Sequence, residues 1–563
     1  MIYHCEDHTC NYWDEGEKLP ERCPQCGRKL LRANEADMTG DDWTALGNTL
    51  WDAEASDKKR MVDCFRKAAY LGSAWGVCNL GICMEQGNGV EADPVQAFWL
   101  YQQAVEMGSL NAVCCLGVCY QYGIGTAPDA EKAAELYCKA AEYGSPRGQM
   151  LLARAFHDGI GVEADAAEAM HWVRAAAYQR YGEGMHRLGV CYEYGDGVEQ
   201  NWEHAVHWFR EAAESGVSTA MTDLGYCYEK GCGVEQSWEQ AFSWYRRGAE
   251  CGYPVSMSNL GLCYKRGYGV EQNWQEAIKW YEQGAQCGDL QSMHNLACCY
   301  ERGEGVEQNE DRALYWYRRG AEAGSDYCMY CLGWNYSNGE GVEQNMTEAI
   351  RWYTAAAEGG NADAMHDLGW HYDHGEGVEQ DMKKAICWYE RAAEQNHPAA
   401  MNSLGECYAM GWGVPRDLET AMEWYRRAAE LGEAMADYNM GWHLEQAGKL
   451  SEAYAHYRKA ADGNDDSAWW ALGRFYENGV VVAQDGKEAR RCYETGEKLG
   501  SVKCKMRLAR CKLLGIGGRR AKKAGLDLCR QALELAKESS EKEDYGYEAE
   551  MNLLRRTIAE NES

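Results

Sequence analysis

STAMTDLGYCYEKGCGVEQSWEQAFSWYRRGAECG, residues 218–252, holds the pattern from which the architecture of the chain follows. Ala220, Leu224 and Tyr228 are spaced four residues apart, which places them on one side of a helix and gives it one apolar face. Gly231 and Gly233 end this helix, because glycine accepts the positive φ angles that a tight turn needs. The stretch therefore begins with an amphipathic helix and a glycine turn.

A second helix is predicted for residues 238–251, with Ala241 and Tyr245 on its inward side. Gly252 is expected to end it in the left-handed conformation. Gly225 of the first helix has no side chain and lets the second helix approach closely. The stretch thus predicts a helical hairpin.

This hairpin recurs along the chain. A Leu-Gly pair or a close variant marks each copy, and all intervals from Leu80 to Met440 are 36 residues. The marker residues are Leu46, Leu80, Leu116, Leu152, Leu188, Leu224, Leu260, Leu296, Leu332, Leu368, Leu404, Met440, Leu472 and Leu508. A fixed period of this length predicts an all-α, right-handed superhelical solenoid of helix-turn-helix repeats of about 36 residues.

One copy shows the repeat pattern in full. Its residues are Ala364, Leu368, Gly369, Tyr372, Gly375, Gly377, Val378, Ala385, Trp388, Tyr389, Ala392 and Ala393. This pattern resembles the Sel-one-like repeat, a relative of the tetratricopeptide repeat, and the resemblance extends from about Asp41 to about Leu535. It implies an adaptor or scaffold that binds other proteins.

A cysteine cluster precedes the repeats. Cys5, Cys10, Cys23 and Cys26 have the spacing C-x4-C-x12-C-x2-C, and four thiolates suit tetrahedral Zn²⁺. The second pair resembles the knuckle of zinc-ribbon and rubredoxin-like modules, which implies a structural zinc site. The first pair is irregular, so His8 is an alternative ligand to Cys5 or Cys10. Iron and a metal-free segment are the remaining alternatives.

These patterns divide the chain into four parts. We predict a zinc-ribbon-like module with four cysteine ligands at 1–32, a linker at 33–40, the repeat solenoid at 41–517, and the last repeat helix with a C-terminal helical cap at 518–563. The cap is expected because a terminal repeat must cover its exposed apolar face.

The charge of the chain limits the classes of partner that it can bind. Lys and Arg number 57 and Asp and Glu number 88, giving a formal net charge of −31. This excludes nucleic acid as the main ligand and favours a protein or peptide partner, including one with a basic face. The first residues do not resemble a signal peptide, and no apolar stretch is long enough to span a membrane, so we expect a cytoplasmic protein.

Many of the 27 cysteines occupy one recurring position, three residues after the marker Leu. In stacked repeats these positions are about 9–10 Å apart, too far for disulfides, which need Cα atoms within about 7 Å. We therefore predict reduced, buried thiols at this position. The tryptophans that recur on the second helix, such as Trp244, are likewise interpreted as packing residues.

A partner surface is predicted on the first helices, at the positions two before, two after and five after the marker Leu, which lie opposite its buried side. The candidate residues are Tyr330, Trp334, His366, Trp370, Asn402, Glu406, Tyr438 and Trp442. Exposed aromatic side chains favour a protein-binding hot spot. The alternative is that these side chains pack against the neighbouring repeat.

The sequence thus predicts a non-catalytic interaction scaffold, with no catalytic residue assigned. A zinc-dependent regulatory or sensor protein is the alternative, and an enzyme with a dispersed active site is less favoured because no nucleophile, base and orienting group stand together. His186, His294 and His366 recur on the first helices but are separated by whole repeats, which argues against a shared metal.

Overall fold

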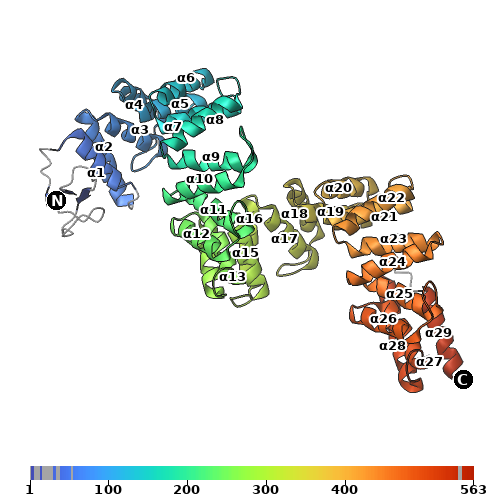
Figure 1. The fold of residues 1–563 in the computed structure, drawn as a ribbon. Helices are drawn as coiled ribbons and strands as arrows, with labels where there is room; N and C mark the ends of the chain where they lie inside the picture. The colour runs from blue at the N-terminus through green and yellow to red at the C-terminus, as the bar shows by residue number, and fades with distance from the viewer. Residues whose placement is uncertain are drawn as a thin grey trace. The chain divides into compact units, whose positions relative to one another are not determined.

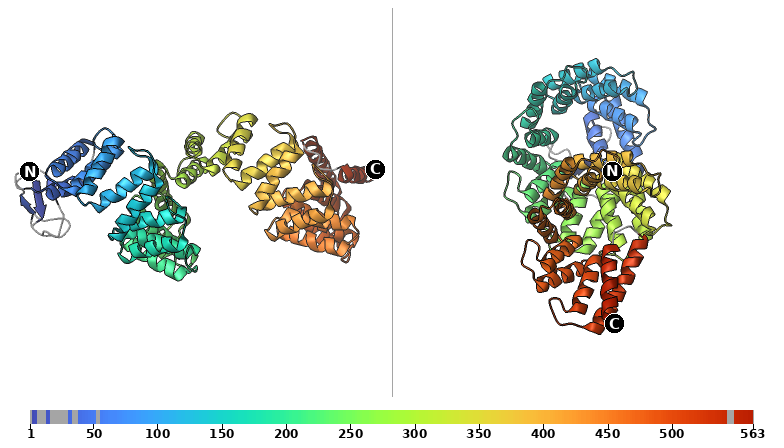
Figure 2. Two further views of the ribbon diagram at one scale, coloured as in Figure 1. Left: turned by 90° about the horizontal axis from the view of Figure 1, so that it is seen from above. Right: turned by 90° about the vertical axis from the view of Figure 1, so that its right-hand side faces the viewer.

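The computed structural model describes residues 2–5, 13–15, 30–32, 38–51, 55–542 and 548–562. The chain forms two compact units, Met1–Ser292 and Met293–Ser563. In each unit, helical hairpins follow one another and each stacks on the next (Figures 1 and 2). This confirms the all-α repeat solenoid, while its right-handed superhelical twist stays a prediction.

The first unit begins with three short strands. β1 (Ile2–Cys5) lies between β2 (Trp13–Glu15) and β3 (Leu30–Arg32) and is antiparallel to both. The helices that follow are α1 (Gly40–Thr49), α2 (Ala55–Tyr70), α3 (Ala74–Gln86), α4 (Pro94–Glu106), α5 (Leu110–Tyr122), α6 (Ala130–Glu142), α7 (Pro146–Asp158), α8 (Ala166–Tyr178), α9 (Gly182–Tyr194), α10 (Trp202–Glu214), α11 (Ser218–Lys230), α12 (Trp238–Glu250), α13 (Pro254–Arg266) and α14 (Trp274–Gln286).

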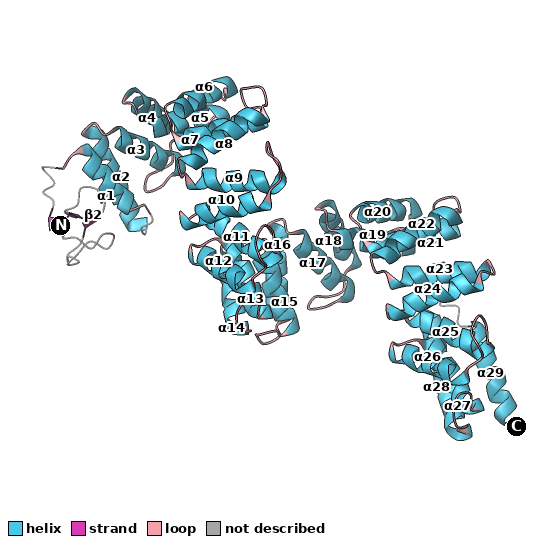
Figure 3. Ribbon diagram, viewed as in Figure 1, coloured by secondary structure: helices cyan, strands magenta, loops and turns pink. Residues whose placement is uncertain are grey.

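Helix α15 (Leu290–Arg302) begins at the last residues of the first unit. The second unit continues with α16 (Glu310–Glu322), α17 (Asp326–Asn338), α18 (Met346–Glu358), α19 (Ala362–His374), α20 (Met382–Glu394), α21 (Pro398–Met410), α22 (Leu418–Glu430), α23 (Ala434–Gln446), α24 (Leu450–Asp462), α25 (Asp466–Asn478), α26 (Gly486–Lys498), α27 (Val502–Leu514), α28 (Lys522–Lys542) and α29 (Glu548–Glu562). Short loops join the helices (Figure 3). The predicted boundaries at 32, 40 and 517 stay predictions.

Most turns between the two helices of a repeat have two glycines with separate roles. Gly231 ends α11 in the left-handed conformation, with φ of 75°, and its N–H donates to the carbonyl of Cys227. Gly233 also has a positive φ, of 68°, and a Cβ there would lie 2.4 Å from the backbone of Trp202 in the preceding repeat. The second glycine therefore fixes the turn against the previous hairpin, a contact the sequence pattern alone does not predict.

A column of tyrosines forms the centre of the core. Tyr245 of α12 is fully buried, and a Cβ on Gly225 would lie 2.6 Å from its ring, which confirms the predicted role of Gly225. The fully buried tyrosines are Tyr101, Tyr137, Tyr245, Tyr281, Tyr317, Tyr353, Tyr389, Tyr425, Tyr457 and Tyr493. Several of their hydroxyls donate to a side chain of the preceding helix: Tyr101 to Glu85 (2.6 Å), Tyr137 to Gln121 (2.7 Å), Tyr245 to Glu229 (2.9 Å) and Tyr493 to Glu477 (2.8 Å).

The recurring cysteines are buried free thiols, as predicted: Cys83, Cys119, Cys191, Cys227, Cys263 and Cys407. Burial raises the pKa of Cys83 to about 11 and that of Cys263 to about 12, so both are protonated at neutral pH. The recurring tryptophans are half-buried, and Trp208, Trp244, Trp280, Trp388 and Trp424 pack against the core. This confirms packing as the interpretation of those five rings.

The last helix covers the end of the array. Met551 and Leu554 of α29 join a buried cluster with Leu513 of α27. Arg507 of α27 donates from Nη2 to Oε1 of the buried Glu550 at 2.8 Å. Helix α29 therefore lies where a cap is predicted and is held there by apolar contacts and an ion pair.

Candidate functional site

Three exposed tryptophans stand out among the eight predicted partner-binding residues. Trp334 of α17 is 46% exposed, Trp370 of α19 is 36% exposed and Trp442 of α23 is 37% exposed. Trp370 stacks on His374 with ring centroids 4.2 Å apart, and the edge of Trp442 meets His443 at 4.7 Å. We call these three side chains the tryptophan face, and all belong to the second unit.

The residues two positions before the marker Leu lie instead between neighbouring repeats. The Tyr330 hydroxyl donates to Oδ2 of Asp367 in the next repeat at 3.0 Å, and Asn439 donates to Oδ1 of Asn402 at 3.0 Å. Asn402 is 6% exposed, so the expected exposure is wrong for this residue. The reason is that consecutive first helices pack side by side and cover this position.

The remaining candidates are also partly enclosed. His366 is half-buried and stacks on His397, with centroids 5.2 Å apart. Tyr438 is half-buried against Tyr457, and burial raises its pKa to about 12. Burial also raises the pKa of Glu406, whose carboxylate accepts from Asn439 at 2.9 Å. These contacts match the packing alternative, whereas partner binding by the whole set stays a prediction.

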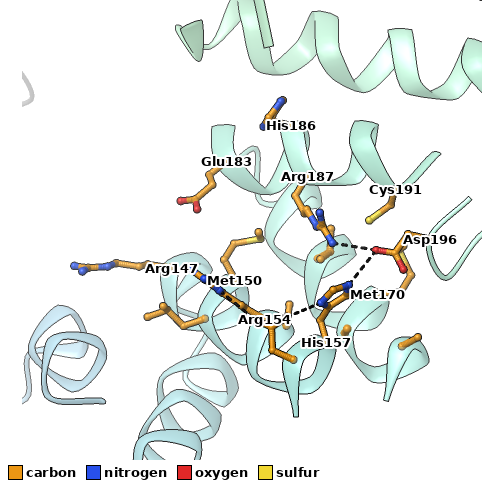
Figure 4. A pocket seen from close by; sticks show the side chains of 16 residues that line it. Arg147, Met150, Arg154, His157, Met170, Glu183, His186, Arg187, Cys191 and Asp196 are labelled. Carbon is orange, nitrogen blue, oxygen red and sulfur yellow. Dashed lines mark hydrogen bonds and ion pairs between the residues drawn. The ribbon is translucent and has the colours of Figure 1, made fainter. Parts of the chain in front are cut away.

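A pocket of about 520 Å³ lies among α7, α8 and α9 of the first unit. Its apolar lining is Met150, Leu151, Ala153, Ala166, Ala169, Met170 and Val173. Its polar lining is Arg147, Arg154, His157, Asp158, Glu183, His186, Arg187 and Asp196, together with the thiol of Cys191 (Figure 4). We call this space the α7–α9 pocket.

The charged groups of the α7–α9 pocket are connected. Asp196 faces both Arg187 and His157 (Figure 4): Arg187 Nη2 donates to Asp196 Oδ2 at 3.0 Å, and His157 Nε2 lies 3.6 Å from the same oxygen. His157 Nδ1 lies 2.7 Å from Asp158 Oδ1, and Asp158 also pairs with Arg154. These neighbours, His157 first, lower the pKa of Asp158, so its carboxylate stays charged at neutral pH.

None of the residues predicted as site residues lines this pocket, although the sequence carries a signal for it. Ala153 stands where most copies have glycine, which predicts only looser packing. Val173 stands at the repeat position where most copies have tyrosine. A smaller residue at this second core position of the same repeat indicates that the core is not filled. Reading each column of the repeat for its exceptions would have found the site.

The predicted zinc site is not described. Cys10, Cys23, Cys26 and the alternative ligand His8 lie outside the described residues, and only the backbone of Cys5 is placed, in β1. Within the described ranges, no group of three or more His, Cys, Asp or Glu side chains is arranged to hold a metal ion. None of the helices described for this chain combines the length and apolar character needed to cross a bilayer.

Comparisons with known proteins agree with this architecture. The Sel1 repeat model matches residues 76–109, 112–145, 146–181, 182–217, 218–253, 254–289, 290–325, 326–361, 362–397, 398–433, 434–465 and 468–501. The crystal structure of c5321, a protective antigen present in uropathogenic Escherichia coli strains displaying an SLR fold, is 29% identical, with 76% of this chain and 94% of that chain covered and a TM-score of 0.51. A Sel1 repeat protein from Oxalobacter formigenes is 32% identical, with 43% of this chain and 96% of that chain covered and a TM-score of 0.40. No curated protein matches the chain.

Proposed function

The chain belongs to the Sel1 repeat family, and we propose that it is a non-catalytic scaffold that holds a partner polypeptide against Trp334, Trp370 and Trp442. Sel1 repeat proteins are generally protein-interaction scaffolds. The proposal is carried by the exposure of these three rings two residues after the marker residue, where other repeats have smaller or charged residues, such as Val118 and Arg154, or in one repeat the exposed Tyr226. Exposed tryptophans supply large contact areas and have few rotors to order on binding.

The chemistry of the partner follows from charge. With a net charge of −31, the chain attracts a polypeptide that surrounds its apolar anchor with Lys or Arg. Glu406 lies on α21, between the helices of Trp370 and Trp442, but it is bonded to Asn402 and Asn439 within the array. We therefore assign the contact to the tryptophans rather than to Glu406. The buried free thiols support our further proposal of a cytoplasmic location.

The test is the Trp334→Ala/Trp370→Ala double variant. Capture of the basic partner from the host cell should fall at least tenfold, because two anchors are removed. The Tm should change by less than about 2 °C, since exposed side chains contribute little to folding. A large drop in Tm, or capture at the level of the unchanged chain, would contradict the proposal.

Trp412→Ala is the matched control. Trp412 is 48% exposed but lies on the turn after α21, away from the first-helix column of the tryptophan face. Its replacement should leave capture unchanged. Equal losses in this control and in the double variant would show that capture depends on general surface hydrophobicity, against the proposed site.

A further inference from the structure

In most described repeats, a tyrosine fills the space between its own first helix and the first helix of the next repeat. Tyr245 packs on Gly225 of α11 and donates to Glu229 of the same helix. Tyr245 and Cys263 of α13 belong to the same buried cluster, and burial, followed by Glu229, raises the pKa of Tyr245. The surroundings of a filled site are therefore a glycine, an acceptor and a thiol.

The repeat formed by α7 and α8 lacks this ring. Val173 stands where the later repeat has Tyr245, and Ala153 stands where it has Gly225, each 72 residues earlier in the sequence. In the same register His157 replaces Glu229, and Cys191 of α9 corresponds to Cys263. These four residues all line the α7–α9 pocket, so the pocket lies at the position in its repeat where a tyrosine ring packs elsewhere.

The size of the pocket suits a ring. An apolar cavity of about 150 Å³ is enough to bind benzene in a protein core. The α7–α9 pocket has about 520 Å³, and its apolar wall is formed by Ala153, Met170 and Val173. The side chains of His157, Arg187 and Asp196 are 47%, 38% and 36% exposed, so the polar end of the pocket is accessible to solvent.

The polar end suits a neutral group that both donates and accepts hydrogen bonds. Over the whole lining, Arg147, Arg154 and Arg187 are balanced by Asp158, Glu183 and Asp196, so the lining has no net charge with histidine neutral. Arg147 and Glu183 lie on the side away from Arg187 and Asp196 (Figure 4). A guanidinium has five N–H donors, and Arg187 uses one nitrogen on Asp196. A phenol hydroxyl can accept from Arg187 while it donates to Asp196.

We propose that the α7–α9 pocket binds a phenol ring, free or as the side chain of a tyrosine in a polypeptide, with the ring on Ala153 and Val173 and the hydroxyl at Arg187 and Asp196. This inference does not rest on the tryptophan face, because the pocket lies in the first unit and the three tryptophans in the second. Each of the two proposals can therefore fail alone.

The test uses the full chain with ¹³C-labelled methionine methyl groups. Met150 and Met170 line the pocket, and their resonances are identified by replacing each with leucine. Titration with p-cresol should shift both resonances to saturation, with a Kd of about 1 mM or tighter for a ligand of this size. Toluene, which lacks the hydroxyl, should bind about five- to tenfold more weakly because it forms no hydrogen bond at the polar end.

A second probe distinguishes the source of the ring. N-acetyl-L-tyrosinamide carries the same ring on a peptide backbone. If it shifts Met150 and Met170 as p-cresol does, the ligand is a tyrosine side chain; if only p-cresol binds, the ligand is a free phenol. Either result supports the phenol site.

The Ala153→Gly/Val173→Tyr variant restores the pattern of the filled repeat, so the chain's own ring should occupy the pocket and weaken p-cresol binding at least tenfold. Ala153→Gly/Val173→Phe follows the Gly189 and Phe209 pair of the next repeat and gives the same test if the first variant does not fold. The control is Ala297→Gly, in a repeat that already contains Tyr317, which should leave binding unchanged. No saturable shift in the unaltered chain, equal binding of toluene, or wild-type affinity in a folded filled variant would overturn the inference.

Discussion

Residues 146–181 and 218–253 have the same arrangement of two helices but differ in what lies between them. Tyr245 fills the second repeat, whereas Val173 lines a pocket of about 520 Å³ in the first. Two flanking residues also differ, since Ala153 stands in place of the glycine and His157 in place of the hydroxyl's acceptor, although alanine also stands beside a tyrosine in the repeat of Ala297 and Tyr317. The comparison shows that one repeat can have a pocket where another has a core side chain, while its two helices keep the same lengths.

The largest change in the free energy of unfolding is expected when residues 218–253 are made to resemble residues 146–181. Tyr245→Val removes a buried ring and its hydrogen bond to Glu229, and should lower the free energy of unfolding by about 3–4 kcal/mol. Urea unfolding followed by circular dichroism measures this loss. A loss below about 1 kcal/mol would mean that the helices close over the space, and the comparison between the two repeats would not hold.

A smaller loss of stability is expected from a substitution that tests whether Gly225 and the ring of Tyr245 depend on each other. Gly225→Ala places a Cβ 2.6 Å from the Tyr245 ring and should cost about 1–3 kcal/mol. In the Tyr245→Val background the same change should instead be stabilising, because alanine fills part of the cavity and favours helix by about 1 kcal/mol. A double-mutant cycle measures the coupling, and additive effects would contradict it.

A third repeat, which begins with α25, differs from many others in the charge of its first N-cap residue. Asp465 is the N-cap of α25, where many first helices have a neutral cap such as Ser145 or Asn361. Burial raises the pKa of Asp465 to about 6, despite N–H donation from Ala468, and Asp466 and Glu433 add to the increase. Its charged form is therefore destabilising above pH 6 and harmless below its unfolded pKa of about 3.9.

Asp465→Asn keeps a capping oxygen and removes the charge, so it should raise stability at pH 7 by about 1 kcal/mol, a value reduced for solvent screening. The gain should shrink as the pH falls from about 6 to about 4. Urea unfolding at a series of pH values measures it. A gain that persists at pH 4 would assign the effect to something other than ionisation.

Replacement of the N-terminal cysteines is expected to change the stability of the two repeats least. We predict about one Zn²⁺ per chain, lost in a Cys23→Ser/Cys26→Ser variant, with less than about 1 kcal/mol change in the unfolding of the repeats. Metal content by mass spectrometry and urea unfolding measure the two parts. Iron in place of zinc would contradict the predicted metal, and no metal would contradict the predicted ligand set.

The repeat frame is predictable because its signals are local. Four-residue spacing and paired glycines set the bounds of α11 and α12, and both lie where the sequence predicts them. Exposure is less predictable, as Asn402 shows. Helical periodicity states which side of a helix a residue lies on, but the distance to the next helix decides whether that side is covered.

The α7–α9 pocket is predictable from the sequence in part. Val173 and Ala153 are visible exceptions in their columns, so the missing ring is readable from the sequence. The contacts among Arg187, Asp196 and His157 cannot be read from the sequence, because they depend on how α7 and the turn after α9 approach each other. The sequence thus indicates where the core is incomplete, and the structure shows which groups surround the gap.

The contact of Gly233 with the backbone of Trp202 has a consequence for how such arrays change in length. Several turns meet the preceding hairpin through main-chain atoms, and the same close approach recurs at Gly125, Gly161 and Gly269, whereas Gly341 meets side chains. Where the joint is made by the main chain, it is indifferent to most side chains. Duplication or deletion of a whole hairpin reproduces it, whereas a single-residue insertion in the turn displaces it, so array length varies most readily in complete modules.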